Sequence, residues 1–134
     1  MARGNVVVDL GQGLSESAHT RPIDLDHLDR QTLGDGGLQA EVLRMFDDLV
    51  ARTFLRLEQS AELAEVLSHL KVLRAGAEGV GAFPLARLAA QTEEELTTGV
   101  NINPERVDDL QMAVEELRAF IAVLLGKIEA ELGE

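Results

Sequence analysis

Residues 70–86, LKVLRAGAEGVGAFPLA, decide the fold because they predict the end of one helix and the start of the next. The apolar residues before the turn recur at the three- and four-residue spacing of one helical face, namely Leu70, Leu73, Ala77 and Val80. Gly79, Gly81 and Pro84 then break or turn the chain, and Leu85 opens a new periodic pattern. The stretch therefore predicts two helices joined by a short connection, which makes them antiparallel neighbours.

The same spacing predicts a helix before this stretch and extends the helix that contains it. The upstream helix has about 20 residues, with an apolar stripe of Leu38, Val42, Met45, Phe46, Leu49 and Thr53. We expect Ser60 to cap the following helix, because a serine oxygen accepts a hydrogen bond from a free N–H at a helix start. The stripe of that following helix is expected to be Leu63, Val66, Leu67, Leu70, Leu73, Ala77 and Val80.

Two more helices are predicted on the C-terminal side. The first closes near Gly99 and carries a stripe of Leu85, Leu88, Ala89, Thr92 and Leu96. Asn103 followed by Pro104 predicts the start of the second, as a side-chain cap and a proline at the first turn. Its apolar residues repeat in steps of three and four, as in the seam of a helix bundle, at Val107, Leu110, Val114, Leu117, Ile121, Leu124 and Ile128.

Four long helices with short connections predict an all-α fold, an antiparallel up-down four-helix bundle. A short extra N-terminal helix is expected on Ile23, Leu25 and Leu28, and it ends near the GDGG breaker at residues 34–37. We assign residues 21–134 to this bundle. Residues 1–20 lack a sustained period and are expected to be a flexible arm, in which residues 5–10 could add a strand to another chain.

The composition limits the class of protein. The 12 basic and 24 acidic residues give a formal net charge of −12, which argues against nucleic acid or an anionic membrane as a partner. No cysteine is present, so disulfides and thiolate metal sites are excluded, and we expect no cofactor and no metal. The sequence shows no signal-peptide hydrophobic region and no apolar run of roughly 20 residues that would span a bilayer. A cytoplasmic location is therefore expected.

The residues from Lys71 onward resemble the signature helix of histidine-containing phosphotransfer (HPt) domains, the relay modules of two-component signalling. The family pattern runs His, any, Leu, Lys, Gly, small, Ala, two of any kind, aliphatic, Gly, Ala. The sequence matches it at Leu73, Ala77, Val80, Gly81 and Ala82. It departs from it in three places, because Arg74 replaces the lysine, Ala75 replaces the first glycine, and Lys71 occupies the position of the phosphate-accepting histidine.

The resemblance covers roughly residues 22–125. PIDL at residues 22–25, LGD at residues 33–35 and EVLRMF at residues 41–46 also look like the opening of bacterial HPt domains. The resemblance implies a helical bundle whose reactive residue faces solvent from the middle of a long helix. It implies a response-regulator receiver domain or a hybrid histidine kinase as the partner, in a bacterial phosphorelay pathway.

A lysine at the acceptor position changes the chemistry. Transfer from an aspartyl phosphate needs an unprotonated nucleophile, which imidazole supplies at pH 7 because its reference pKa is about 6.5. A lysine amine, with a reference pKa of about 10.4, is almost entirely protonated at that pH. We therefore expect the chain to bind its partner without accepting phosphate at Lys71. That ammonium is either an ordinary solvated group or the counter-charge for the acidic pocket of a receiver.

Lys71 is one step, about 100°, from the buried stripe, and so lies at the border of the exposed face. Ala75 and Glu78 follow it at one and two turns. The predicted partner-binding surface consists of Lys71, Arg74, Ala75, Gly76 and Glu78. Gly76 fits either close approach of a partner or close packing of a neighbouring helix, and Arg74 fits either a contact with a carboxylate or phosphate or an internal salt bridge.

His69 is the alternative phosphate acceptor. It lies about 200° from Lys71 on the same helix, and its use requires a shifted register that spoils the other matches. His19 and His27 are expected to be ordinary surface or half-buried histidines. A di-metal carboxylate enzyme is disfavoured, because such bundles carry paired Glu-x-x-His motifs, whereas Glu65 and His69 are four apart and no second pair exists. The run of glutamates at residues 93–95 is interpreted as a solvated face.

A helical dimer or adaptor with no relay role is the remaining alternative. The heptad of the last helix would serve an intermolecular coiled coil as well as an internal core. Because the bundle needs that stripe for its own core, a monomer is expected rather than a homodimer.

Overall fold

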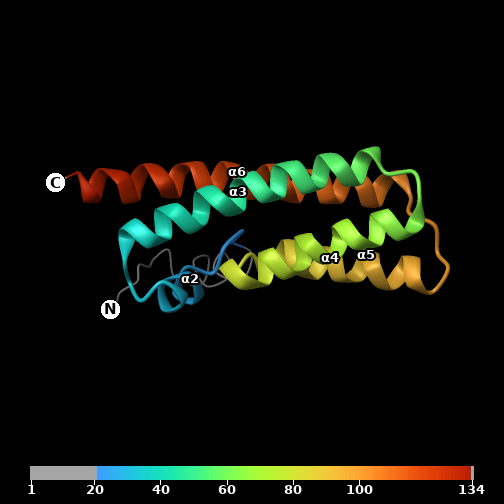
Figure 1. Cartoon of the computed structure of the whole chain (residues 1–134), viewed down its shortest axis with the longest axis horizontal. Coiled ribbons are helices and arrows are strands. Elements are labelled where there is room, and N and C mark those ends of the chain that lie inside the picture. Colours follow the sequence, from blue (N-terminus) through green and yellow to red (C-terminus); the bar gives the residue numbers. More distant parts are fainter. Residues whose placement is uncertain (1–20, 134) are drawn as a thin grey trace, which may run out of the picture.

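The computed structural model describes residues 21–133, and in this range the chain is all-helical, with no strand. Its helices are α2 (Leu25–Gln31), α3 (Gly36–Gln59), α4 (Leu63–Val80), α5 (Phe83–Thr97) and α6 (Pro104–Leu132), as Figure 1 shows. The predicted all-α class is confirmed for this part of the chain. The arm expected over residues 1–20, the strand considered for residues 5–10 and His19 lie outside the described residues.

The four long helices pack in a closed order, α3 on α4, α4 on α5, α5 on α6 and α6 on α3. Figure 1 shows α6 running beside α3 and α4 running beside α5, while the short α2 lies near the C-terminal end of α4. The connections at residues 60–62, 81–82 and 98–103 are short. The core between the helices is built mainly from fully buried leucines, such as Leu43, Leu73 and Leu110. None of the described helices combines the length and apolar content needed to cross a membrane.

The start of α6 is where the sequence predicts it. The Asn103 side chain accepts a hydrogen bond from the backbone N–H of Arg106 at 2.7 Å, and Pro104 is the first helical residue. Asp24 and Asp35 cap α2 and α3 in the same way, each through a side-chain oxygen that accepts a backbone N–H three residues ahead. These caps satisfy donors that would otherwise lack a partner at the helix ends.

The prediction for Ser60 is wrong, because this residue ends α3 and does not start α4. Its hydroxyl donates to the backbone C=O of Arg56 at 2.7 Å, and its N–H donates to the C=O of Leu57. α4 begins after Glu62, whose side chain makes no capping hydrogen bond. A serine hydroxyl can bond either to a carbonyl behind it or to an N–H ahead of it, and here the free carbonyls of the last turn of α3 are its partners.

The GDGG segment is a breaker only in its first half. Gly34 has a φ of +70° and lies in the turn, whereas Gly36 and Gly37 form the first turn of α3. A Cβ on Gly36 would lie 3.4 Å from Cδ2 of Leu132, so this glycine lets the start of α3 approach the end of α6 closely. The helix consequently begins two residues before the Leu38 start that the apolar pattern indicates.

The turn between α4 and α5 also holds α2 in place. Gly81 adopts a left-handed φ of +89°, and its C=O accepts a hydrogen bond from the backbone N–H of Asp24 at 2.8 Å. The half-buried His27 lies 3.2 Å through Nε2 from the C=O of Gly79, and its ring meets Phe83 edge-on at 5.2 Å. The expectation of a surface or half-buried His27 is confirmed, and its contacts attach α2 to the α4–α5 turn.

The predicted apolar stripe of α3 is confirmed at Phe46 and Thr53, which are buried, and is wrong at Leu38 and Met45. The residues that α3 buries are Ala40, Leu43, Phe46, Val50, Thr53, Phe54 and Leu57. Leu38 and Met45, which the periodicity placed in the stripe, are 41% and 72% exposed. Two apolar stripes run along α3 at the same spacing, and only packing against α4 and α6 decides which one is buried. Leu63, predicted to be the first residue of the α4 stripe, is also exposed.

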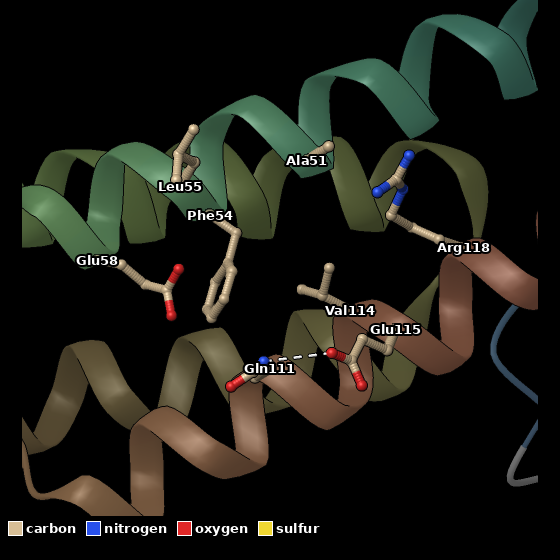
Figure 2. Close-up of a pocket in the computed structure, with 8 residues that line it drawn as sticks. All are labelled: Ala51, Phe54, Leu55, Glu58, Gln111, Val114, Glu115 and Arg118. Atoms are coloured by element: carbon tan, nitrogen blue, oxygen red, sulfur yellow. Dashed lines mark hydrogen bonds between the residues drawn. The ribbon is translucent and has the colours of Figure 1, made fainter.

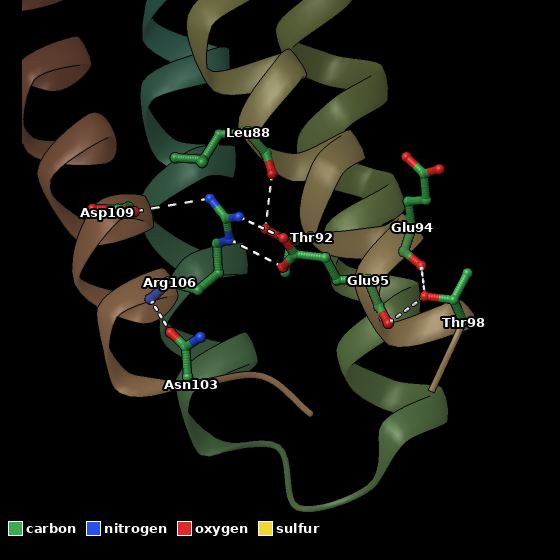
Figure 3. A network of polar contacts seen from close by, with 8 residues as sticks. All are labelled: Leu88, Thr92, Glu94, Glu95, Thr98, Asn103, Arg106 and Asp109. Atoms are coloured by element: carbon green, nitrogen blue, oxygen red, sulfur yellow. Dashed lines mark hydrogen bonds and ion pairs between the residues drawn. The ribbon is translucent and has the colours of Figure 1, made fainter. Parts of the chain in front are cut away.

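The interpretation of residues 93–95 as a solvated face is wrong for two of the three glutamates. Figure 3 shows that Glu95 holds Arg106 of α6 in a forked pair, with Nη2–Oε2 at 2.6 Å and Nε–Oε1 at 3.2 Å. Asp109 is 3.8 Å from the same guanidinium. The hydrogen bond with Glu95 is the main cause that raises the pKa of Arg106 above its ordinary value. Glu93 pairs with α4, so α5 uses its acidic residues to join two neighbours.

Candidate functional site

Lys71, the residue at the expected acceptor position, is exposed on α4. It lies next to Leu70 in sequence, whose side chain is fully buried, so the helix places it at the edge of the outer face as its position predicts. Ala75 and Glu78, one and two turns further on, are exposed as well. The structure thus brings Lys71, Ala75 and Glu78 together on one solvent-facing surface.

Gly79 belongs to this surface, as its sequence position one turn after Ala75 predicts. It is an exposed residue in the last turn of α4, and a Cβ placed on it would have no heavy atom within 4 Å. The packing of the chain therefore gives no reason for a glycine here, and glycine costs up to about 1 kcal/mol relative to alanine in a helix. The sequence shows the glycine, but only the structure shows that the position of a Cβ on Gly79 is open.

Gly76 lies on a different side of α4 and faces α3. A Cβ on Gly76 would be 2.9 Å from Cδ2 of Leu49 and 3.4 Å from Cε1 of Phe46. Of the two roles that the sequence left open for this glycine, the structure shows the packing contact. Gly76 therefore marks the border between the exposed surface and the α3–α4 interface.

Arg74 is engaged inside the chain. Its Nε donates to Oε1 of Glu93 on α5 at 2.6 Å, and its Nη1 is 4.0 Å from Oε2 of Glu78. The hydrogen bond and the charge of Glu93 raise the pKa of Arg74 above its ordinary value. Of the two roles left open for Arg74, the structure shows the internal salt bridge, so part of its hydrogen-bonding capacity is already used by carboxylates of the same chain.

His69 does not share the surface of Lys71. It is half-buried, and its position about 200° round the helix places it on the side where Gly76 meets α3. This agrees with the separation that the sequence predicts. Within residues 21–133, no group of three or more metal-binding side chains is close enough to hold an ion, and Glu65 and His69 gain no further carboxylate or histidine.

Apolar side chains of α3 border the same surface, and the sequence analysis missed them because it placed them in the core. Met45 is 72% exposed and Leu49 is half-buried. Leu49 contacts the Gly76 position, and Met45 is one turn before it on α3. Val72 on α4 is 40% exposed and lies one turn before Gly76. We call Lys71, Val72, Ala75, Glu78 and Gly79, together with Met45 and Leu49, the α3–α4 face.

A groove of about 450 Å³ lies between α3 and α6, away from α4. Figure 2 shows Phe54 and Val114 on its floor, with Glu58 and Glu115 at its rim. Arg118, which also lines it, is held by Asp47 through Nε at 2.8 Å, and this bond raises the pKa of Arg118. The lining side chains include no serine, threonine, histidine or lysine, so the groove lacks a nucleophile paired with a base.

The α3–α4 face is therefore the site that the structure assembles around the predicted residues. It holds one exposed ammonium, a carboxylate, small residues and partly exposed apolar side chains. Comparison of the chain with protein-family models, with curated protein sequences and with solved structures found no match.

Proposed function

We propose that this chain is an HPt-like module of two-component signalling, an antiparallel four-helix bundle that docks a receiver domain through the α3–α4 face without accepting phosphate there. The observation that carries the proposal is the exposure of Lys71, at the position of the phosphate acceptor, on a surface of small residues. The resemblance of residues 71–82 to the HPt signature supplies the class of partner.

The composition of the face supports binding to an acidic surface. The receiver domains that HPt proteins bind have an acidic active site made of carboxylates. The Lys71 ammonium is a compact positive charge that can pair with these carboxylates. Ala75 and Gly79 have little or no side chain, so a loop of the partner can reach the backbone of α4. Met45 and Val72 add exposed apolar area at the edge, as protein interfaces commonly do.

The chemistry of the amine supports binding without transfer. Lys71 is an exposed lysine at the position where the family that the chain resembles has its phosphate-accepting histidine. His69, also on α4, is half-buried and lies about 200° round the helix from Lys71. A phosphoryl group on a receiver aspartate therefore meets no histidine acceptor at the usual position on α4.

The experiment measures binding and transfer separately with the full chain. A panel of receiver domains from one bacterial genome is phosphorylated with labelled acetyl phosphate, and each is incubated with the chain. We expect at least one receiver to bind without label appearing on the chain. Label on the wild-type chain would overturn the absence of transfer, and a further His69→Ala variant would then show whether His69 carries it.

Charge reversal then locates the binding surface. Lys71→Glu is expected to lower the affinity for the receiver at least about tenfold, which corresponds to about 1.4 kcal/mol of binding free energy. Lys127→Glu is the matched control, because the sequence has two lysines and this one lies on α6. Equal affinity of the wild type and Lys71→Glu would remove the α3–α4 face from the proposal. Absence of binding to every receiver would remove the HPt-like role and leave the adaptor alternative.

A further inference from the structure

One side of α6 carries apolar side chains that stay wholly or partly exposed, although Phe120 on this side also packs against the core of the chain. The residues that α6 buries are Leu110, Val114, Leu117, Ile121 and Ile128. Met112 and Val123 lie outside that seam and are 59% and 60% exposed, and Phe120 is half-buried beside it. Figure 1 shows that the C-terminal half of α6 runs on past the start of α5, so α5 does not cover it.

The charged residues along this part of α6 are divided between two sides of the helix. Arg118 and Glu129 form ion pairs with side chains of α3, and Glu115 lines the groove between α3 and α6. The remaining charged residues between positions 112 and 130 are Glu116 and Lys127, and both are exposed. This outer side is therefore neutral in sum, although the chain as a whole carries −12.

Glu116, Phe120, Val123 and Lys127 follow one another in steps of four, three and four residues, so they form one stripe along the helix. We call these four residues the outer stripe of α6. The stripe is symmetric about the midpoint between residues 121 and 122. Glu116 is as far before that midpoint as Lys127 is after it, and Phe120 is as far before it as Val123 is after it.

This symmetry matches a two-fold pair of antiparallel helices. When two copies of α6 cross at the midpoint of the stripe, Glu116 of each copy faces Lys127 of the other, and Phe120 faces Val123. Opposite charges then meet at both ends of an apolar centre. A parallel pair in the same register would place Glu116 against Glu116 and Lys127 against Lys127, which is unfavourable.

We propose that the chain forms a two-fold homodimer through the outer stripe of α6. The apolar centre is covered by the second copy, and the two Glu116–Lys127 pairs fix the direction and register of the helices. The internal seam of α6 stays in the core, and the second copy covers only those parts of Phe120 and Val123 that the bundle leaves exposed. The contact is separate from the α3–α4 face and stands whether or not a receiver binds there.

Charge reversal with rescue tests the proposal on the full chain. Sedimentation equilibrium over a wide range of concentration should show a reversible dimer. Lys127→Glu and Glu116→Lys are each expected to raise the dimer Kd at least about tenfold, because like charges then face each other twice per dimer. The double variant Glu116→Lys with Lys127→Glu restores opposite charges and is expected to return the Kd to within about threefold of the wild type. Lys71→Glu makes the same charge change on α4 and is expected to leave the Kd unchanged.

Two results would overturn the dimer. A wild-type chain that is monomeric at every concentration removes it directly. A dimer whose Kd is the same in both single charge variants must use another surface. Val123→Glu gives a further check. When the wild type is a dimer, a monomeric Val123→Glu variant supports the proposal. If the wild type is always monomeric and Val123→Glu lowers its melting temperature, another segment of the same chain covers the outer stripe.

Discussion

Arg74 on α4 donates from Nε to Oε1 of Glu93 on α5 at 2.6 Å, and this contact joins the helix of the α3–α4 face to its neighbour. The Glu93 side chain is 14% exposed and the Arg74 side chain 35%, so the pair is partly shielded from water. The cation that the HPt resemblance would direct toward a partner is thus bound to a carboxylate of the same chain. The pair has consequences for both stability and binding.

Replacing Glu93 with glutamine should weaken the fold and strengthen the receiver complex. The charge-assisted hydrogen bond is lost, and we expect the free energy of unfolding to fall by about 1 kcal/mol, less than for a fully buried pair because water reaches the arginine. The charge of the Arg74 guanidinium is then no longer neutralised by Glu93, so an acidic partner can use it. Urea denaturation measures the first effect and receiver titration the second. Asp48→Asn, which breaks the exposed pair with Arg52, is the control and should change stability by less than about 0.5 kcal/mol.

Replacing Arg106 with lysine should make the stability sensitive to alkaline pH. The pKa of Arg106 is raised in the folded chain, so its stabilisation is complete at any pH below the ordinary pKa of an arginine and is lost only above it. A lysine has a reference pKa of about 10.4, so its pairing with Glu95 is lost from about pH 10 upward. Denaturation at several pH values should show the stability difference between the two proteins widening there.

Arg87→Lys is the control for the alkaline effect, because Arg87 is exposed on α5 and forms no ion pair with the residues that the structure describes. The stability difference between this variant and the wild type should stay constant from neutral pH to about pH 11. A constant difference for Arg106→Lys as well would contradict the role assigned to the Glu95 pair.

Replacing Gly79 with alanine should stabilise the chain and weaken the receiver complex. A Cβ at Gly79 meets nothing within 4 Å, so the helix gains up to about 1 kcal/mol without a clash. Gly126 on α6 also has nothing within 4 Å of such a Cβ, and Gly126→Ala is therefore the matched control. Both variants should melt at higher temperature, but only Gly79→Ala should bind the receiver less tightly. Equal receiver affinity would show that close approach at Gly79 is not needed.

Replacing Gly81 with alanine should be more damaging than replacing Gly99, although both glycines have positive φ values of +89° and +95°. The left-handed conformation costs an alanine about 1 kcal/mol at either position. At Gly81 the Cβ would also lie 3.0 Å from Cδ2 of His27 and 3.1 Å from the backbone oxygen of Asp24, whereas at Gly99 it meets nothing within 4 Å. Chemical denaturation should show Gly81→Ala to be less stable than Gly99→Ala by about 1 kcal/mol or more.

Equal losses for the two glycine variants would mean that α2 moves away from the α4–α5 turn at little cost. His27→Ala separates these cases, because it removes Cδ2, the atom nearest to the new Cβ, while the His27 Cβ at 3.2 Å and the Asp24 oxygen at 3.1 Å remain. In that background, the difference between Gly81→Ala and Gly99→Ala should become smaller.

Much of the candidate site could be predicted from the sequence, because position on a helix follows from spacing. One residue step from the buried Leu70 places Lys71 at the solvent edge, and one and two further turns place Ala75 and Glu78 beside it. The direction of Gly76 and the partner of Arg74 could not be predicted in this way. Both depend on side chains of other helices, which come close only when α3, α4 and α5 pack.

The sequence by itself determined where the helices lie, since apolar spacing and caps such as Asn103 act within a few residues of each other. Only the tertiary structure decided which of the two apolar stripes of α3 is buried, so that Leu43 is in the core while Met45 faces water. It also decided that Glu93 and Glu95 pair with Arg74 and Arg106 and are not solvated. The physical reason is that a helix with two equivalent stripes, or a carboxylate with several arginines in the sequence, has no preference until packing brings one partner within contact distance.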